Sequence, residues 1–287
     1  MADTRLAGLP RTLTALLALG LLLGGLGACP RSGGDAGGPQ VTTPPGGPRF
    51  ELTIPPGYTA QTDLTRDLLS RAWLALHDTY QVEPPYQWRV IYETQAAPGF
   101  PDLPSPPVYE GAGTLRLGVD YLVAPSGDER WINAQMLGTM EGLAEVFDDY
   151  LGLGNTQVEN GLAAMMARNV APGMWAGLRA AEMNAYIIRY QDEEDRNVKF
   201  WLDNQRPPEG AETRVLDRQR QLLLWSGIAE RGSADMWPRV FRDLQRRGLP
   251  LTKVTSPAEG NRELIKTLRR VTGQDFTELF QKYGFEV

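Results

Sequence analysis

The residues best suited to chemistry lie close together in residues 137–152, "LGTMEGLAEVFDDYLG". Apolar residues at three- and four-residue steps predict a helix over residues 130–151 with one face turned into a core. Glu141 and Glu145 lie one turn apart on the adjoining face, followed by Asp148 and Asp149. Two carboxyl groups in a cleft can form an acid and base pair, because like charges raise one pKa. A solvated helix face is the alternative interpretation of the same pattern.

The residues around Glu141 resemble the motif of the gluzincin metallopeptidases. That family carries H-E-x-x-H on one helix and a glutamate on the next, often within "EGLA". Here residues 140–144 read "MEGLA", and the next predicted helix contains "NGLA" at residues 160–163. The resemblance extends loosely over residues 60–287, including the final segment "VTGQDFTELFQKYGF". It implies a gluzincin-like fold in which Glu141 stands where the family has its general base.

The zinc-ligand positions of that motif carry the wrong residue types. A catalytic zinc needs about three imidazole or carboxylate ligands and an open position for water. In the resemblance these positions fall on Met140, a thioether, on Ala144, which has no donor, and on Asn160, a neutral amide. The only histidine, His77, is predicted to be a partly exposed residue of an earlier helix. We therefore expect no metal, no cofactor and no catalytic residue in this degenerate motif.

The N-terminus is similar to a bacterial lipoprotein signal. Arg5 and Arg11 precede the apolar run "TLTALLALGLLLGGLGA", which ends directly before Cys29. The residues that carry the similarity are "LGAC" at 26–29. It implies a signal peptide over residues 1–28, lipid on Cys29, and a location in the cell envelope facing outside the cytoplasm. An uncleaved membrane span is the alternative, since about 18 apolar residues can cross a bilayer.

The rest of the chain divides into a tether and one domain. In residues 30–49 eleven of twenty residues are Gly or Pro, which predicts a flexible tether over residues 29–49. In the domain, residues 50–287, strand-like runs at 86–94 and 114–123 flank a proline-rich segment that predicts a long loop. The expected class is α+β, helix-dominated, with a small sheet on the N-terminal side. Helices are predicted over residues 63–80, 129–151, 159–169, 173–204, 210–230, 234–247, 259–272 and 274–283.

The charge and the motifs together define the expected function. The formal net charge of −6 argues against a nucleic-acid partner and leaves the lipid on Cys29 as the contact with the membrane. We expect an extracytoplasmic lipoprotein whose non-catalytic peptidase-like domain binds a peptide, a protein or a glycan-like envelope polymer. The candidate binding residues are Glu141, Glu145, Glu159 and Asn160. Two alternatives remain open: a metal-free hydrolase that uses Glu141 with Glu145 or Glu159, and a solute-binding or envelope-assembly lipoprotein.

Overall fold

The residues that the computed structural model describes all belong to Val41–Val287, one of the two units into which the chain divides. The described residues are 47–94, 107–122, 129–153, 156–175, 177–206, 208–209, 213–233, 235–246 and 255–287. The predicted signal peptide, Cys29 and the tether up to residue 46 lie outside them. Within these ranges, no helix combines the length and the apolar character needed to cross a membrane.

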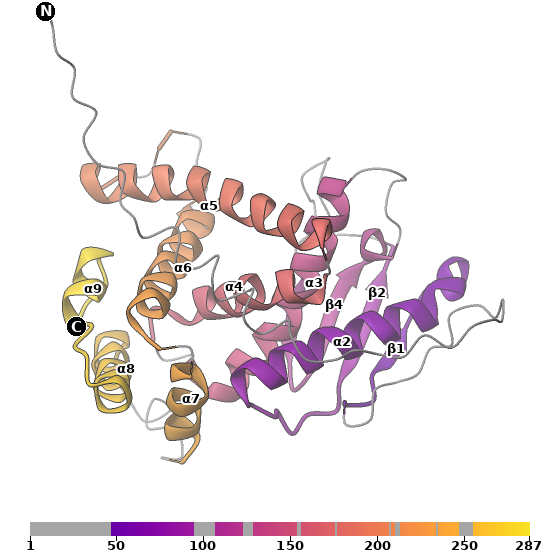
Figure 1. Cartoon of the computed structure of the whole chain (residues 1–287), viewed down its shortest axis with the longest axis horizontal. Coiled ribbons are helices and arrows are strands. Elements are labelled where there is room, and N and C mark those ends of the chain that lie inside the picture. Colours follow the sequence, from indigo (N-terminus) through magenta and orange to yellow (C-terminus); the bar gives the residue numbers. More distant parts are fainter. Residues whose placement is uncertain are drawn as a thin grey trace, which may run out of the picture. The chain divides into compact units, whose positions relative to one another are not determined.

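A small mixed sheet forms one side of the unit (Figure 1). Its strand order is β1-β2-β4-β3, with parallel pairing between β1, β2 and β4 and antiparallel pairing of β3 with β4. The bounds are β1 Glu51–Thr53, β2 Arg89–Glu93, β3 Val108–Gly111 and β4 Thr114–Gly118. Helix α2, Thr62–Tyr80, connects the parallel strands β1 and β2. Such a connection is needed because parallel neighbours cannot be joined by a tight turn.

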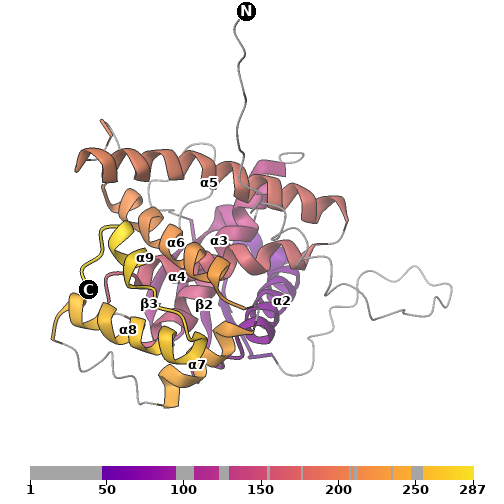
Figure 2. The same cartoon turned by 60° about the vertical axis from the view of Figure 1, so that its left-hand side comes forward.

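Helices make up the rest of the described unit. Helix α3 packs between the sheet and α4, and α4 packs in turn on α6, while α5 lies across α6 (Figure 2). In Figure 1, α8 and α9 lie on the side of the unit opposite the strands. The bounds are α3 Glu129–Leu151, α4 Glu159–Val170, α5 Leu178–Asn204, α6 Thr213–Arg231, α7 Met236–Arg246, α8 Pro257–Thr272 and α9 Thr277–Lys282. This arrangement confirms the predicted α+β, helix-dominated class with a small sheet.

The apolar stripe of α3 is the centre of the core. Phe147 lies between α2 and β2, with its ring centroid 6.3 Å from that of Trp73 and 5.9 Å from that of Trp88. The predicted inward face of α3 is therefore confirmed. Its buried members are Met136, Leu137, Met140, Leu143, Ala144, Phe147 and Leu151.

The structure corrects the sequence prediction at several places. The strand-like run predicted over residues 114–123 ends as β4 at Gly118 and continues into a short 3-10 helix, Val119–Tyr121. The segment predicted as a loop between the two strand-like runs contains β3, which turns into β4 through Gly111, Ala112 and Gly113, all with positive φ. Strand β1 was not predicted, because three residues carry too little periodicity. The helix expected from residue 173 starts at Leu178, since a short 3-10 helix, Ala171–Met174, and Gly177 with φ of 64° precede it.

Candidate functional site

The two motif helices are direct neighbours that run antiparallel. Glu141, in the middle of α3, meets Arg168 near the end of α4, with 4.0 Å between Oε1 and Nε. Glu159, at the start of α4, lies close enough to Asp148, near the end of α3, for its charge to raise the pKa of Asp148. The two motif segments therefore lie on packed helices.

The zinc-ligand positions that can be described belong to the core. Met140 and Ala144 are both fully buried in the apolar cluster between α3 and its neighbours. Asn160 lies in the first turn of α4, but its side chain is outside the described part of the structure. Methionine suits such a position because its flexible side chain fills irregular gaps. At positions 140 and 144 packing explains the residue types without any ligand role.

Glu141 is held by arginines from two other helices. Arg218 of α6 places one guanidinium nitrogen 2.9 Å from Oε2, and Arg168 faces Oε1. The Glu141 side chain is 12% exposed and that of Arg168 is 9% exposed, so the ion pair is mostly shielded from water. Burial raises the pKa of the nearby Tyr121 hydroxyl, and the negative charge of Glu141 raises it further. Each carboxylate oxygen of Glu141 thus faces a cation, the arrangement expected for a structural ion pair.

The glycines of the two motif segments allow close packing. A Cβ on Gly142 would lie 2.9 Å from a Leu115 methyl carbon of β4. A Cβ on Gly161 would lie 2.5 Å from backbone atoms of Gln221 and Leu222 in α6. Real Cβ atoms do not approach other atoms so closely, so the glycines set the distances between α3 and the sheet and between α4 and α6.

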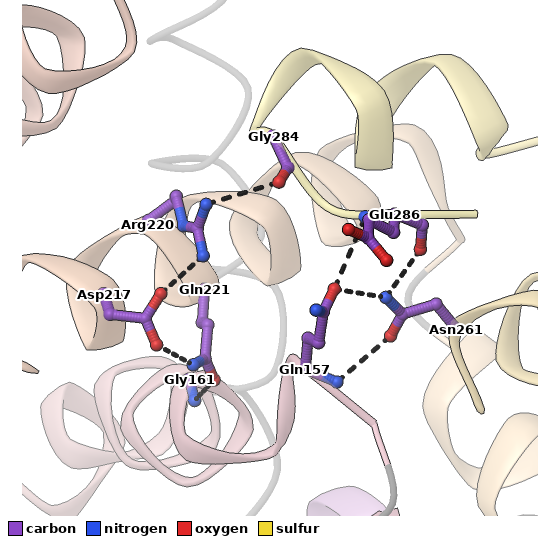
Figure 3. A network of polar contacts seen from close by, with 8 residues as sticks. All are labelled: Gln157, Gly161, Asp217, Arg220, Gln221, Asn261, Gly284 and Glu286. Carbon is purple, nitrogen blue, oxygen red and sulfur yellow. Dashed lines mark hydrogen bonds and ion pairs between the residues drawn. The ribbon is translucent and has the colours of Figure 1, made fainter. Parts of the chain in front are cut away.

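The start of α4 is tied to α6 and to the C-terminus through polar side chains (Figure 3). The backbone N–H of Gly161 donates to Gln221 Oε1 at 3.1 Å, which satisfies a donor that a helix start leaves unpaired. Gln221 and Arg220 both donate to Asp217, at 2.9 and 2.5 Å. Arg220 also donates to the carbonyl of Gly284 at 3.4 Å. This network fixes the position of the "NGLA" segment.

A second part of the network centres on Asn261 of α8. This fully buried amide donates to the carbonyl of Glu286 at 2.8 Å and to Gln157 Oε1 at 3.0 Å, and accepts from the Gln157 backbone N–H at 3.2 Å. Figure 3 shows Asn261 between the loop before α4 and the last residues of the chain. Asn261 was not predicted as a functional residue, because one amide in a helical pattern gives no signal of long-range pairing.

The two acidic residues in the last turn of α3 differ in burial, since Asp149 is exposed and Asp148 is buried. Asp148 is 9% exposed, and its buried Oδ1 has no hydrogen-bond partner in the described part of the chain. Burial raises the pKa of Asp148 well above its ordinary value, and the charges of Glu159, Glu145 and Asp149 raise it further. Burial likewise raises the pKa of Glu159. The notion of a solvated run is therefore wrong for Asp148.

Asp149 links α3 to the sheet. Tyr86, in the segment before β2, donates to its Oδ2 at 3.1 Å, and Tyr109 of β3 donates to the same oxygen at 2.8 Å. Burial and then the Asp149 charge raise the pKa of Tyr86 to about 12, so its hydroxyl keeps the proton that it donates. Two neutral donors thus share one carboxylate oxygen, which leaves Asp149 as a junction between helix and sheet.

The remaining candidates do not build a metal centre. Across the described ranges, no three His, Cys, Asp or Glu residues are arranged to hold a metal ion. His77 is half-buried on α2, with its ring stacked on Trp73 at 4.8 Å and its Nδ1 3.1 Å from Asp78, as expected for a helix residue. A hollow of about 320 Å³ opens beside Trp73 and Tyr86, but Glu141 does not line it.

Comparisons with known proteins add no family. The chain matches no protein-family model, no curated protein and no solved structure at a significant level.

Proposed function

We propose that this chain is a lipid-anchored, extracytoplasmic protein whose peptidase-like domain is non-catalytic and binds a peptide, a protein or an envelope polymer. The observation that carries the proposal is the state of Glu141, which is paired with Arg218 at 2.9 Å and faces Arg168. A general base beside a catalytic zinc must have a free carboxylate oxygen directed at the metal-bound water. Here that role is replaced by an ion pair, and the neighbouring ligand positions 140 and 144 are core.

The order of the elements also supports a peptidase-like domain. The resemblance to the gluzincins implies this order of elements: a leading helix, a strand pair with a long connection, a motif helix and a second motif helix. The chain has α2, then the strands β2 to β4, then the packed pair α3 and α4. A fold can persist when a site has lost its chemistry, so a peptidase-like order of elements is consistent with a domain that binds without cleaving.

Strand β3 favours an extended peptide among the candidate ligands. Among the described strands it pairs only with β4, so its other edge has no strand partner. Val108, its first residue, is 48% exposed. An edge strand offers backbone N–H and C=O groups to which an extended segment can add. Because β3 also contacts α3, a peptide on this edge would lie beside the motif helix.

The two alternatives have less support. A metal-free hydrolase needs Glu141 as an acid or base, but its carboxylate is already engaged by Arg218. A solute-binding protein with its cleft between two α/β lobes needs two sheets, whereas the described strands form one four-stranded sheet.

Glu141→Gln separates a structural role from a catalytic one. The change should lower the free energy of unfolding by about 1–2 kcal/mol, between the costs for exposed and for buried pairs, because two arginines lose their counter-charge while the Arg218 side chain is 36% exposed. The matched control is Glu263→Gln, which breaks the surface pair with Lys266 and should change stability by less than about 0.5 kcal/mol. Urea unfolding measures both variants, and a peptide-cleavage assay with added zinc runs beside it. Zinc-dependent cleavage by the wild type, lost in Glu141→Gln without loss of stability, would overturn the proposal.

A further inference from the structure

The end of α3 concentrates negative charge at the junction with α4. Asp148 and Asp149 lie in the last turn of α3, which contains no basic residue. A helix C-terminus carries partial negative charge, so two acids there are unfavourable unless a positive charge compensates them. Glu159 from α4 and Glu145 from the preceding turn of α3 add to the same field at Asp148. The field of these acids therefore makes a charged Asp148 unfavourable.

Asp148 is the buried acid of this cluster, since Glu145 and Glu159 are half-buried and Asp149 is exposed. It is 9% exposed, and its buried Oδ1 accepts no hydrogen bond from the described residues. Its neighbour Asp149 receives two tyrosine hydroxyls, one of them Tyr109 of β3, which is neutral. A buried ionised carboxylate with neither a hydrogen bond nor a counter-ion is strongly unfavourable. The position is stable only if Asp148 is uncharged.

Cations on the elements around α3 do not supply the missing charge. Asp120, in the 3-10 helix η2 (Val119–Tyr121), lies toward the opposite end of α3, where its backbone carbonyl accepts a hydrogen bond from Gln135. Glu93 and Glu110 share Arg116 at the sheet. The described cations of α2, β4, α4 and α7 have other partners or are exposed. The pairs are Arg66 with Asp63, Arg71 with Asp67, His77 with Asp78, Arg116 with Glu110, Arg168 with Glu141, Arg239 with Asp235 and Arg242 with Gln81. Arg246 of α7 is exposed, as are Arg189, Arg196 and Lys199 of α5.

The cation that fits this place is a proton. The described acids do not form a group of three with the geometry of a metal site. A proton needs only one oxygen, and it turns Asp148 into a neutral carboxylic acid that can remain buried between two helices. No counter-ion from another element is then required.

We propose that Asp148 is a proton-binding switch at the α3–α4 junction: the protonated acid keeps the two helices packed, and its deprotonation loosens them. Loss of the proton places a fourth negative charge among Glu145, Asp149 and Glu159. The carboxylate then gains stability by reaching water, which the packed junction does not allow. The domain is therefore held together more tightly in acid than in alkali. This inference is independent of the proposed binding function.

The direction of the pH dependence follows from linkage. The pKa of Asp148 is higher in the folded chain than its ordinary value of 3.8. The unfolded chain therefore releases its proton first, so the stabilisation is complete below the unfolded pKa and is lost as the pH rises through the folded pKa. Over that window one proton changes the ratio of folded to unfolded chains by up to about tenfold per pH unit.

The test compares wild type, Asp148→Asn and Asp203→Asn by urea unfolding from about pH 5 to pH 9. In the wild type the ratio of folded to unfolded chains should fall by up to about tenfold per pH unit. Asparagine has the shape of the protonated acid but does not titrate, so Asp148→Asn should not show this fall. Asp203 is an exposed residue of α5, and its variant should keep the wild-type dependence. Equal slopes for wild type and Asp148→Asn would overturn the proposal.

A second measurement remains decisive if Asp148→Asn fails to fold. Carbon NMR of the full chain with labelled aspartate carboxyl groups follows Asp148 directly. Its resonance should titrate at a higher pH than the exposed aspartates, and Glu159→Gln should move that midpoint to lower pH by removing a facing charge. An Asp148 carboxyl that titrates with the exposed aspartates, or a midpoint unmoved in Glu159→Gln, contradicts the switch.

Discussion

Gly161→Ala should lower the free energy of unfolding by about 3 kcal/mol, as measured by urea denaturation. The new Cβ would lie 2.5 Å from backbone atoms of Gln221 and Leu222, so α4 and α6 must separate. Alanine favours a helix over glycine by about 1 kcal/mol, which offsets only part of this cost. The backbone of α6 cannot turn aside as a side chain can. The cost of separating α4 from α6 therefore exceeds the gain in helix propensity from alanine.

Alanine variants of two other glycines serve as controls for Gly161→Ala. A Cβ on Gly57 would have no other atom within 4 Å, so Gly57→Ala should leave stability within about 0.5 kcal/mol of wild type. Gly142→Ala should fall between the two, because its new Cβ meets side-chain atoms of Leu115 and Pro107 that can shift. If Gly161→Ala were as stable as Gly57→Ala, the close crossing of α4 and α6 would be wrong.

Asn261→Ala is expected to cost about 3 kcal/mol of stability. The amide makes three hydrogen bonds at 2.8 to 3.2 Å in a site with no solvent exposure. Its removal leaves the Gln157 N–H and the Glu286 carbonyl without this partner, and each unsatisfied buried group costs about 1–3 kcal/mol. The loss should also release the C-terminal residues from α4, which makes the last amides of the chain exchange faster with solvent.

An exposed asparagine provides the control for that variant. Asn204 donates to the carbonyl of Phe200 at the exposed end of α5, so Asn204→Ala should change stability by less than about 0.5 kcal/mol. Hydrogen exchange at Phe285 and Glu286 gives the local readout. Unchanged protection there in a folded Asn261→Ala protein would contradict the role assigned to Asn261 in Figure 3.

The regular part of the fold was accessible from local sequence patterns. The stripe that contains Met140, Leu143 and Phe147 repeats at helical steps, and the structure buries all three. The sheet was only half predicted, because β1 has three residues and β3 follows a run of prolines. Strand β1 is stabilised by β2, a partner distant in sequence that periodicity within a short window does not report. Strand β3 pairs with the adjacent β4, but it is too short to show a periodic pattern of its own.

The candidate site was predictable in position but not in its contacts. The "MEGLA" and "NGLA" strings directed attention to α3 and α4, which do pack together. The pairing of Glu141 with Arg218 joins residues 77 positions apart, and no local sequence pattern around either residue predicts it. Asp148 looks like its exposed neighbour Asp149 in sequence, yet one is buried and the other is not. Helix orientation decides this difference, and a one-residue step turns a side chain by about 100°.

Zinc content, measured by elemental mass spectrometry, tests the central claim most directly. The protein is purified without a histidine tag, exposed briefly to zinc and desalted, with a gluzincin peptidase of known activity treated in parallel. Because residues 140 and 144 are buried Met and Ala and Glu141 is paired with Arg218, we expect far less than one zinc ion per chain. One zinc ion retained per chain would contradict the account and would mean that the chain has a metal site built from other residues.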